Sequence, residues 1–360
     1  MNSCGVQGVD DEELIRARVL PHYLGWEDAA ISPLPGGLIN RTLLLERDDA
    51  RAVLQRVSPI FSPRIHENIA AVTARLAEAG VPTPRLVPTR TDALYVSDLD
   101  AGPGVWRVLT HVGGVGFDAV SDVRQARSAG ALIARFHRAL DGLQHEFVGM
   151  RANVHDTPAH LRRLAESAAT GAQHRLGAEA RALADEIATA AETLPPLPVI
   201  APRVGHGDLK FSNLLFADHE PPASQRAVCL IDLDTVGPIS LAYELGDAWR
   251  SWCNRAGEDV PEARLDLDVM RASFDGYREG LGRALDAGER EALVLGVEWV
   301  SLELAARFAA DALLETYFGW DPRRFAGRGE HNLVRARGQW SLHGALVASR
   351  AERRAMLDAI

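Results

Sequence analysis

A short polar segment carries the strongest chemical signal of the chain. Residues 206–213 read His-Gly-Asp-Leu-Lys-Phe-Ser-Asn, so Asp208, Lys210 and Asn213 share one loop, and Asp232 ends a later apolar run. Phosphoryl transfer from a nucleotide needs a carboxylate to accept the proton of the attacking hydroxyl, a cation beside the moving phosphoryl group and oxygen ligands for Mg²⁺. Asp208 can be the base, Lys210 the cation, and Asn213 and Asp232 the metal ligands. The alternative is a turn whose Asp and Asn only cap a helix.

This loop and the Ile-Asp pair at 231–232 resemble the H-G-D-x-x-x-x-N loop and the following I-D strand of the phosphotransferase family of aminoglycoside kinases and choline kinases. The resemblance covers most of the chain. It implies a protein-kinase-like pair of lobes, ATP as phosphoryl donor and Mg²⁺ as cofactor. It also implies that Asp208 is the catalytic base and contacts the acceptor, and that Asn213 and Asp232 hold the metal.

Further segments resemble one branch of that family, the N-acetylhexosamine 1-kinases. They are residues 36–40, 53–56, 67–69, 105–107, 231–235 and 330–333. The resemblance implies that the acceptor is the anomeric hydroxyl of an N-acetylhexosamine and that Asp234 helps to bind it. Two other interpretations stay open: an aminoglycoside or amino-alcohol acceptor, such as choline or homoserine, and a nucleotide-binding regulator without catalysis.

Lys210 is the only lysine among 39 basic residues. A compact ammonium fits beside a phosphoryl group in transfer, where a bulky planar guanidinium would collide with it. We therefore expect Lys210 to be catalytic. The alternative is that one lysine remains by chance in an arginine-rich composition.

The first third of the chain supplies the expected nucleotide contacts. Gly36 and Gly37 stand between strand-like runs, where a loop can bring backbone N–H groups to phosphates, although a plain hairpin has the same pattern. Kinase-like folds usually carry a lysine in the third strand, paired with a helix glutamate; this strand has Gln55 and Arg56 instead. Because side chains alternate along a strand, only one of them enters the cleft: position favours Gln55 and charge favours Arg56. Glu67 is the expected helix partner in either case.

The strand-like run 105–112 is the expected hinge between two lobes. An extended strand edge can offer backbone groups to an adenine, so we expect Thr110, His111 and Val112 to bind it. The Gly-x-Gly-x-x-Ala run at 114–119 mimics a dinucleotide-binding fingerprint. Helical patterns follow it where that fold needs a parallel strand, so the mimic fails.

The apolar stretch 287–317 predicts a buried helix with its charges on one face. Glu303 and Arg307 lie one turn apart there, and a buried charge must be paired or must meet a polar ligand. They form an internal salt bridge, or Arg307 reaches the acceptor while Glu303 orients it; the resemblance to the hexosamine kinases favours the second. Trp299, one turn earlier, can stack under a sugar ring or simply belong to the core.

The elements that must position these residues predict an α+β fold. From about 29 to 112, short strand-like runs, 93–97 among them, alternate with turns and one helical stretch, which predicts a small antiparallel sheet carrying one helix. Beyond that point helical patterns dominate, among them 157–170 and 331–357, with strand-like pieces only at 213–217 and 227–232. We predict an N-terminal nucleotide-binding lobe over 1–112, in which 1–28 is a leading segment, and a larger, mainly helical catalytic and acceptor-binding lobe over 113–360.

Composition narrows the classes of function. The 360 residues carry a net charge of −10 and are 47 % hydrophobic, which is an ordinary globular composition without the basic surface that nucleic acids require. The three cysteines fit neither a disulfide framework nor a zinc site, and neither an export signal nor a membrane-spanning run is visible. We expect a cytoplasmic protein whose partner is a small-molecule sugar or related hydroxyl acceptor, not a nucleic acid or a membrane. A monomer and a homodimer are both compatible with the sequence.

Overall fold

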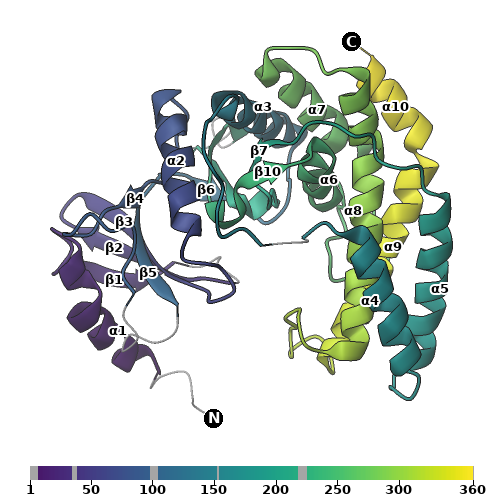
Figure 1. Cartoon of the computed structure of the whole chain (residues 1–360), viewed down its shortest axis with the longest axis horizontal. Helices are drawn as coiled ribbons and strands as arrows, with labels where there is room; N and C mark the ends of the chain where they lie inside the picture. The colour runs from purple at the N-terminus through teal and green to yellow at the C-terminus, as the bar shows by residue number, and fades with distance from the viewer. Residues whose placement is uncertain (1–6, 35–38, 98–103, 152–153, 218–224, 360) are drawn as a thin grey trace.

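A computed structural model describes residues 7–34, 39–97, 104–151, 154–217 and 225–359 of the chain. Figure 1 shows a sheet with two helices at the N-terminal end, joined to a larger and mainly helical part. The elements of the first part are α1 (Gln7–Arg18), β1 (Ala30–Pro33), β2 (Arg41–Arg47), β3 (Ala50–Val57), α2 (Ile65–Glu78), β4 (Leu86–Val87) and β5 (Val105–Thr110).

The first part is built on a five-stranded sheet with the order β1-β2-β3-β5-β4, in which every neighbouring pair is antiparallel. Alternate side chains of the central strands, among them Leu45, Leu54 and Val108, are buried in one hydrophobic cluster with Tyr23. The residues between them face the other way, because successive side chains of a strand point to opposite faces. Gln55 of β3 lies opposite Arg107 of β5 in the register.

The second part holds two further small sheets and most of the helices. Its strands are β6 (Val115–Gly116), β7 (Arg203–Gly205), β8 (Leu214–Phe216), β9 (Ala227–Leu230) and β10 (Gly237–Ile239), paired in the orders β6-β8-β9 and β7-β10. Its helices are α3 (Val123–Leu140), α4 (Thr157–Thr170), α5 (Gly177–Thr193), α6 (Leu241–Trp252), α7 (Leu267–Leu281), α8 (Ala287–Leu314), α9 (Arg328–Ala348) and α10 (Arg350–Asp358).

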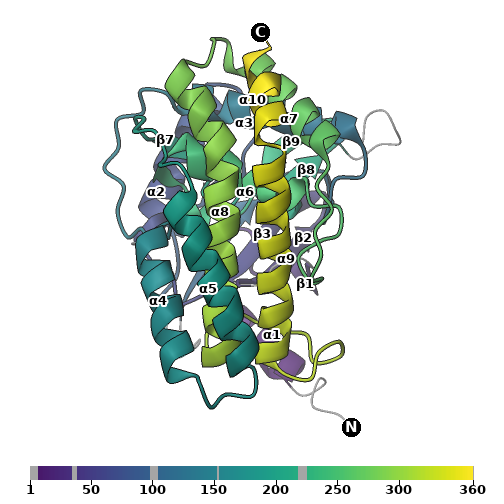
Figure 2. The ribbon, with the colours of Figure 1, turned by 90° about the vertical axis from the view of Figure 1, so that its right-hand side faces the viewer.

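Helix α8 is the central helix of this part. It begins with a capping box, in which the Asp286 side chain accepts from the Glu289 amide and the Glu289 side chain accepts from the Asp286 amide. The helix is apolar nearly all round because α4, α5, α6, α9 and α10 all pack against it. Figure 2 shows α4, α5, α8 and α9 side by side. Helices α3 and α7 also pack closely: a Cβ at Gly276 would lie 1.8 Å from the Arg127 carbonyl oxygen.

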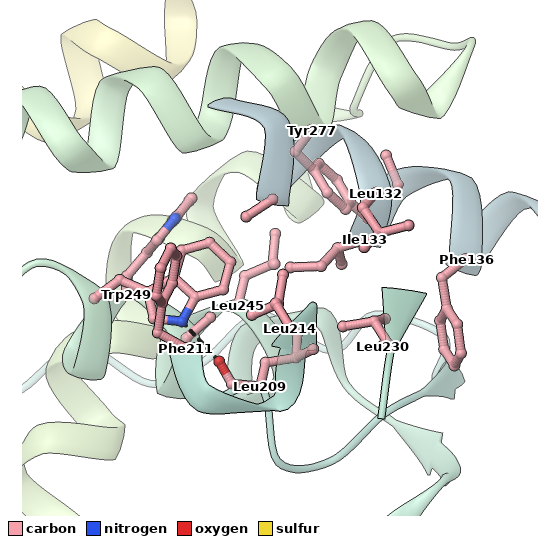
Figure 3. Close-up of a cluster of buried hydrophobic side chains, with 14 of the residues drawn as sticks. Leu132, Ile133, Phe136, Leu209, Phe211, Leu214, Leu230, Leu245, Trp249 and Tyr277 are labelled. Carbon is pink, nitrogen blue, oxygen red and sulfur yellow. Dashed lines mark hydrogen bonds between the residues drawn. The ribbon is translucent and has the colours of Figure 1, made fainter. Parts of the chain in front are cut away.

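The largest hydrophobic cluster anchors the polar loop through two of its apolar side chains, those of Leu209 and Phe211. Leu209 and Phe211 are each 1 % exposed and pack among residues of α3, α6 and α7. Figure 3 shows both side chains in this cluster, with Leu214, Leu245 and Trp249 around them. The indole of Trp252 donates to the Leu209 carbonyl oxygen over 2.7 Å. Burial of alternate residues leaves Asp208 and Lys210 partly exposed, each with a side chain 32 % accessible.

The predicted α+β architecture is confirmed: the first part is an antiparallel sheet with a helix, and the second is mainly helical. The boundary at 112/113 remains a prediction. The strand-like run near 93–97 forms only an isolated bridge between Val96 and Trp106. The predicted helix over 331–357 is divided at Ser349 into α9 and α10. In the described part of the chain, none of the helices is both long and apolar enough to cross a bilayer.

Candidate active site

The polar loop brings its three predicted residues into direct contact. The Lys210 ammonium lies 3.0 Å from Oδ2 of Asp208 and 3.9 Å from Oδ2 of Asp232. The side-chain nitrogen Nδ2 of Asn213 donates to the backbone carbonyl oxygen of Asp208 over 2.8 Å and to Oδ2 of Asp208 over 3.1 Å. Burial acts against the ammonium, but the carboxylates of Asp208 and Asp232 hold the pKa of Lys210 above its ordinary value, so it stays charged. One cation therefore bridges the predicted base and a predicted metal ligand.

The carboxylates in and after this loop concentrate negative charge. Burial and then the charge of Asp234 raise the pKa of Asp232, and Asp208 adds to the effect. A divalent cation relieves such repulsion, and hard cations prefer oxygen ligands. Because the nitrogen of Asn213 is engaged by Asp208, its side-chain oxygen is the atom that can face a metal. The donor set of Asn213 and Asp232 therefore fits Mg²⁺.

The backbone of Asp232 is left-handed, with φ 65° and ψ 59°. That conformation is uncommon outside glycine and costs about 1–3 kcal/mol, although aspartate adopts it more readily than most residues. It turns the chain sharply at the end of β9.

A buried hydrogen-bond network around Glu244 holds the start of the polar loop. The Glu244 carboxylate accepts from the amides of His206 over 2.8 Å and Gly207 over 2.9 Å, and from the ring of His137 over 3.1 Å. Burial acts to raise the pKa of Glu244, but the hydrogen bond and the charge of His137 hold it below its ordinary value. Glu244 was missed from the sequence, where its only signal is a carboxylate inside the apolar stretch of α6.

His206 joins the loop to the strand that carries Asp232. Its Nε2 donates to the Ile231 carbonyl oxygen over 2.8 Å, and its Nδ1 accepts from the Asp208 amide over 3.3 Å. This histidine is fully buried and bonds to the backbone on both sides. It is therefore a positioning residue, which sets the distance between the Asp208 and Asp232 segments.

A cavity of about 380 Å³ lies between the sheet and the loop, and we call it the sheet-side cavity. It brings together six of the predicted site residues: Gln55, Thr110, His111, Val112, Asn213 and Asp232. The Thr110 amide is taken by the Arg85 carbonyl oxygen over 2.8 Å. Within the described residues, the amides of His111 and Val112 have no backbone acceptor, so they can bind a ligand. Gly36 and Gly37 lie outside the described residues.

The choice between Gln55 and Arg56 follows from the strand. Gln55 lines the sheet-side cavity, whereas the Arg56 guanidinium lies 5.8 Å from the ring centre of Trp106, on the opposite face. The structure does not bring Glu67 to either of them. Glu67 lies in the first turn of α2, where it is exposed and pairs with Arg64 over 3.0 Å.

The sheet-side cavity does contain a guanidinium, and it comes from β5. Arg107 is 1 % exposed; its Nε and Nη2 donate to Oε1 of Gln55 over 3.0 and 2.7 Å, and its Nη1 lies 2.6 Å from Oδ1 of Asp234. Asn40 donates to the other oxygen of Asp234 over 2.7 Å. Arg107 was missed as a site residue, although an arginine inside the apolar run of β5 is a visible signal.

Asp234 does not have the free carboxylate expected of an acceptor-binding residue. Burial acts to raise its pKa, but Arg107 holds the pKa of Asp234 below its ordinary value. Both carboxylate oxygens are engaged by Arg107 and Asn40. Asp234 therefore ties the segment after Asp232 to the sheet.

A second cavity of about 520 Å³ lies on the other side of the polar loop, and we call it the loop-side cavity. Gly207 lines this cavity, whereas Asn213 lines the sheet-side cavity. The loop therefore contributes to both cavity walls, and Asp208 follows Gly207 in the chain and bonds to Asn213. The wall of the loop-side cavity includes Tyr243, whose ring stacks on His155 with centres 4.5 Å apart.

The three predicted residues of α8 have different surroundings. Arg307 lines a third cavity of about 190 Å³, which we call the arginine cavity. Glu303 is buried and accepts from the Thr157 hydroxyl over 2.5 Å and from the His155 ring over 3.2 Å; Nη1 of Arg307 is 3.9 Å away. Glu303 thus holds the start of α4 more closely than it holds Arg307. The indole of Trp299 donates to the Pro195 carbonyl oxygen and packs in the core, so the structure does not offer Trp299 to a sugar.

Comparisons with known proteins identify the family and the fold. A family model described as "Phosphotransferase enzyme family" matches residues 30–283. A microcompartment-associated aminopropanol kinase is similar with a TM-score of 0.64 and 19 % identity, over 94 % of this chain and 98 % of that one. Amicoumacin kinase, in complex with AMP-PNP, Ca²⁺ and Ami, is similar with a TM-score of 0.62 and 13 % identity, over 94 % of this chain and 95 % of that one. Choline kinase from Cryptosporidium parvum is similar with a TM-score of 0.58 and 9 % identity, over 96 % of this chain and 98 % of that one. These likenesses confirm the expected kinase-like fold.

Proposed function

The chain belongs to the phosphotransferase enzyme family, and on that premise we propose that it transfers the γ-phosphate of ATP to a hydroxyl of a small molecule across the polar loop. The observation that carries the proposal is the link that Asp208 makes between the two cavity walls: it follows Gly207 of the loop-side cavity in the chain, and its carboxylate accepts from Asn213 of the sheet-side cavity. The nucleotide occupies the first cavity, with its adenine near the amides of His111 and Val112. The acceptor occupies the second.

The residues of the loop have different roles in phosphoryl transfer. Asp208 accepts the proton of the acceptor hydroxyl as the oxygen forms its bond to the γ-phosphorus, and the bond to the bridging oxygen breaks to release ADP. Lys210, held between Asp208 and Asp232, offsets negative charge on the moving phosphoryl group. Mg²⁺, held by Asn213 and Asp232, would neutralise charge on the nucleotide phosphates.

Arg107 takes the place of the missing third-strand lysine as the buried cation of the cleft. Its guanidinium is committed to Gln55 and Asp234, so its role is to hold the sheet and the Asp232 segment at a fixed distance. In the sheet-side cavity, Gln55 and backbone amides therefore bind the nucleotide phosphates. The complete set of Asp208, Asn213 and Asp232 argues against a regulator without catalysis.

For the acceptor, we propose the anomeric hydroxyl of an N-acetylhexosamine. The segments that resemble the hexosamine 1-kinases support this choice, and the stacked Tyr243 and His155 supply an aromatic surface suited to a sugar ring. An aminoglycoside or amino-alcohol acceptor is cationic and needs carboxylates in the wall. Asp156 and Asp234 are the acidic residues among the described residues of the loop-side cavity wall, and Asp234 is already paired.

An ADP-release screen with N-acetylhexosamines, free hexoses, aminoglycosides, choline and homoserine tests this function, with Asp208→Asn as the matched variant. The variant should keep nucleotide affinity and lose about 10²–10⁴ in kcat, which is the usual contribution of a positioned base. Near-wild-type turnover of Asp208→Asn would remove Asp208 from that role. After complete conversion of an N-acetylhexosamine, a reducing-sugar assay should read near zero, because only anomeric transfer removes the reducing end.

A further inference from the structure

The arginine cavity has an unusual charge for a protein with a net charge of −10. Its wall carries three guanidinium groups, those of Arg151, Arg163 and Arg307, and the ring of His160, against one carboxylate, that of Asp311. We call the three arginines the arginine cluster.

The carboxylate of Asp311 is already fully engaged. It accepts from the backbone amides of residues 316, 317 and 318 at 2.8–3.0 Å and from the side-chain amide of Asn332 at 2.9 Å. No arginine of the cluster lies within ion-pair distance of it among the described residues. Asp311 therefore shapes the loop after α8 and does not neutralise the arginine cluster.

Only one counter-charge lies close to the arginine cluster among the described residues, and it belongs to Glu303. In the described part of the chain, Arg151 and Arg163 make no ion pair, and Arg307 has only Glu303 at 3.9 Å. Arg151 donates to the Tyr317 hydroxyl over 3.0 Å, and the Arg307 guanidinium lies 6.0 Å from the centre of the same ring. Burial acts to raise the pKa of Tyr317, but Arg151 and Arg307 lower it overall, which marks a positive local potential.

The arginine cavity adjoins the loop-side cavity, because Arg151 and Val154 line both. An acceptor whose hydroxyl lies near Gly207 can therefore extend its far end toward the guanidinium groups. Guanidinium groups bind carboxylate and phosphate oxygens in a bidentate geometry, and like charges gathered in one cavity favour an anion.

We propose that the phosphoryl acceptor carries an anionic group, a carboxylate or a phosphate, which the arginine cluster binds at the end of the acceptor remote from the reacting hydroxyl. The proposal rests on the phosphotransferase function proposed above and refines its acceptor. An unmodified N-acetylhexosamine is neutral, so the acceptor that satisfies both proposals is an N-acetylhexosamine derivative with a phosphate or carboxylate remote from the anomeric hydroxyl at Asp208.

Binding of inorganic phosphate, measured by calorimetry with saturating MgADP so that the nucleotide site is filled, tests the cluster without turnover. Arg163→Met and Arg307→Met should each weaken phosphate binding at least about fivefold, since each removes a charge-assisted contact. Arg162→Met is the matched control, because Arg162 is an exposed neighbour on α4 that does not line the cavity. Equal phosphate affinity in all three variants would overturn the proposal.

Matched acceptor pairs then test whether the anion belongs to the acceptor. Wild-type kcat/KM should be at least about tenfold higher for N-acetylglucosamine 6-phosphate than for N-acetylglucosamine, or for glucuronate than for glucose, and Arg163→Met should remove the preference. If the ratio of kcat/KM between the anionic and the neutral member is larger for the first pair, the cluster binds a phosphate; if it is larger for the second pair, the cluster binds a carboxylate. Preference for the neutral member of both pairs would overturn the anionic acceptor while leaving the kinase function intact. Failure of every acceptor, with Asp208→Asn indistinguishable from wild type, would instead count against the proposed function.

Discussion

Replacing Arg107 with methionine should destabilise the protein far more than removing an exposed ion pair of the same sheet. Arg107 and Asp234 have side chains only 1 % and 2 % exposed and lie 2.6 Å apart. Removing one partner of a buried pair leaves an uncompensated charge and costs about 3–5 kcal/mol. The free energy of unfolding of Arg107→Met should fall by that amount.

The matched control is Arg51→Met. Arg51 pairs with Glu46 over 2.9 Å in the β2–β3 hairpin, and the two side chains are 60 % and 40 % exposed. Exposed pairs contribute about 0–1 kcal/mol. Urea unfolding followed by tryptophan fluorescence should therefore separate the two variants clearly.

A double-mutant cycle identifies the pair as the cause. Asp234→Leu alone should be as destabilising as Arg107→Met, whereas the double variant should lose less than the sum, because neither buried charge then remains. In folded Arg107→Met, KM for MgATP should rise while KM for the acceptor changes little, since Arg107 positions Gln55 in the sheet-side cavity. Additive losses, or a loss in Arg107→Met no larger than in Arg51→Met, would refute this account.

Three further outcomes follow from the site. Lys210→Arg keeps the charge but changes its shape, so kcat should fall with nucleotide affinity nearly unchanged; wild-type kinetics would mean that the single lysine is accidental. Asp232→Asn tolerates the left-handed backbone yet removes a charged metal ligand, so calorimetry should show weaker MgATP binding with little loss of stability, and normal binding would contradict the metal assignment. Burial, aided by the charge of Arg107, lowers the pKa of His66 from 6.5 to about 4, so the unfolded state binds a proton between these values and the native state does not. The free energy of unfolding should therefore fall by about 2 kcal/mol between pH 7.5 and pH 5 through this group alone, and His66→Gln should lose that part of the slope in urea titrations.

Local patterns were sufficient for much of the fold. The predicted helix over 157–170 coincides with α4 (Thr157–Thr170), and the strand-like piece at 213–217 contains β8. The polar loop was also predictable, because its three side chains lie within six residues and need no distant partner to meet. Such features depend on residues close in sequence, and the sequence contains all of them.

The remaining features depend on register and on which face of an element is covered. Alternation in β3 limited the choice to Gln55 or Arg56, but the sequence could not show that Arg107 lies opposite Gln55 in β5. Glu67 was placed by analogy, whereas α2 begins at Ile65, so Glu67 falls in an exposed first turn. Trp299 lies on a helix covered all round, where apolar periodicity cannot indicate which face meets a cavity.

The shift of the cation from β3 to β5 has a consequence for the metal ligands. The charge of Asp234 is one cause of the raised pKa of Asp232, and Arg107 is the group that neutralises Asp234. The other side chain bonded to Asp234 is the neutral amide of Asn40, so without Arg107 the charge of Asp234 would be uncompensated beside Asp232. With Arg107 in the cleft, one guanidinium both orients Gln55 on the sheet and reduces the repulsion felt by Asp232. The proposed nucleotide side and the proposed metal side of the site therefore depend on the same buried residue, Arg107.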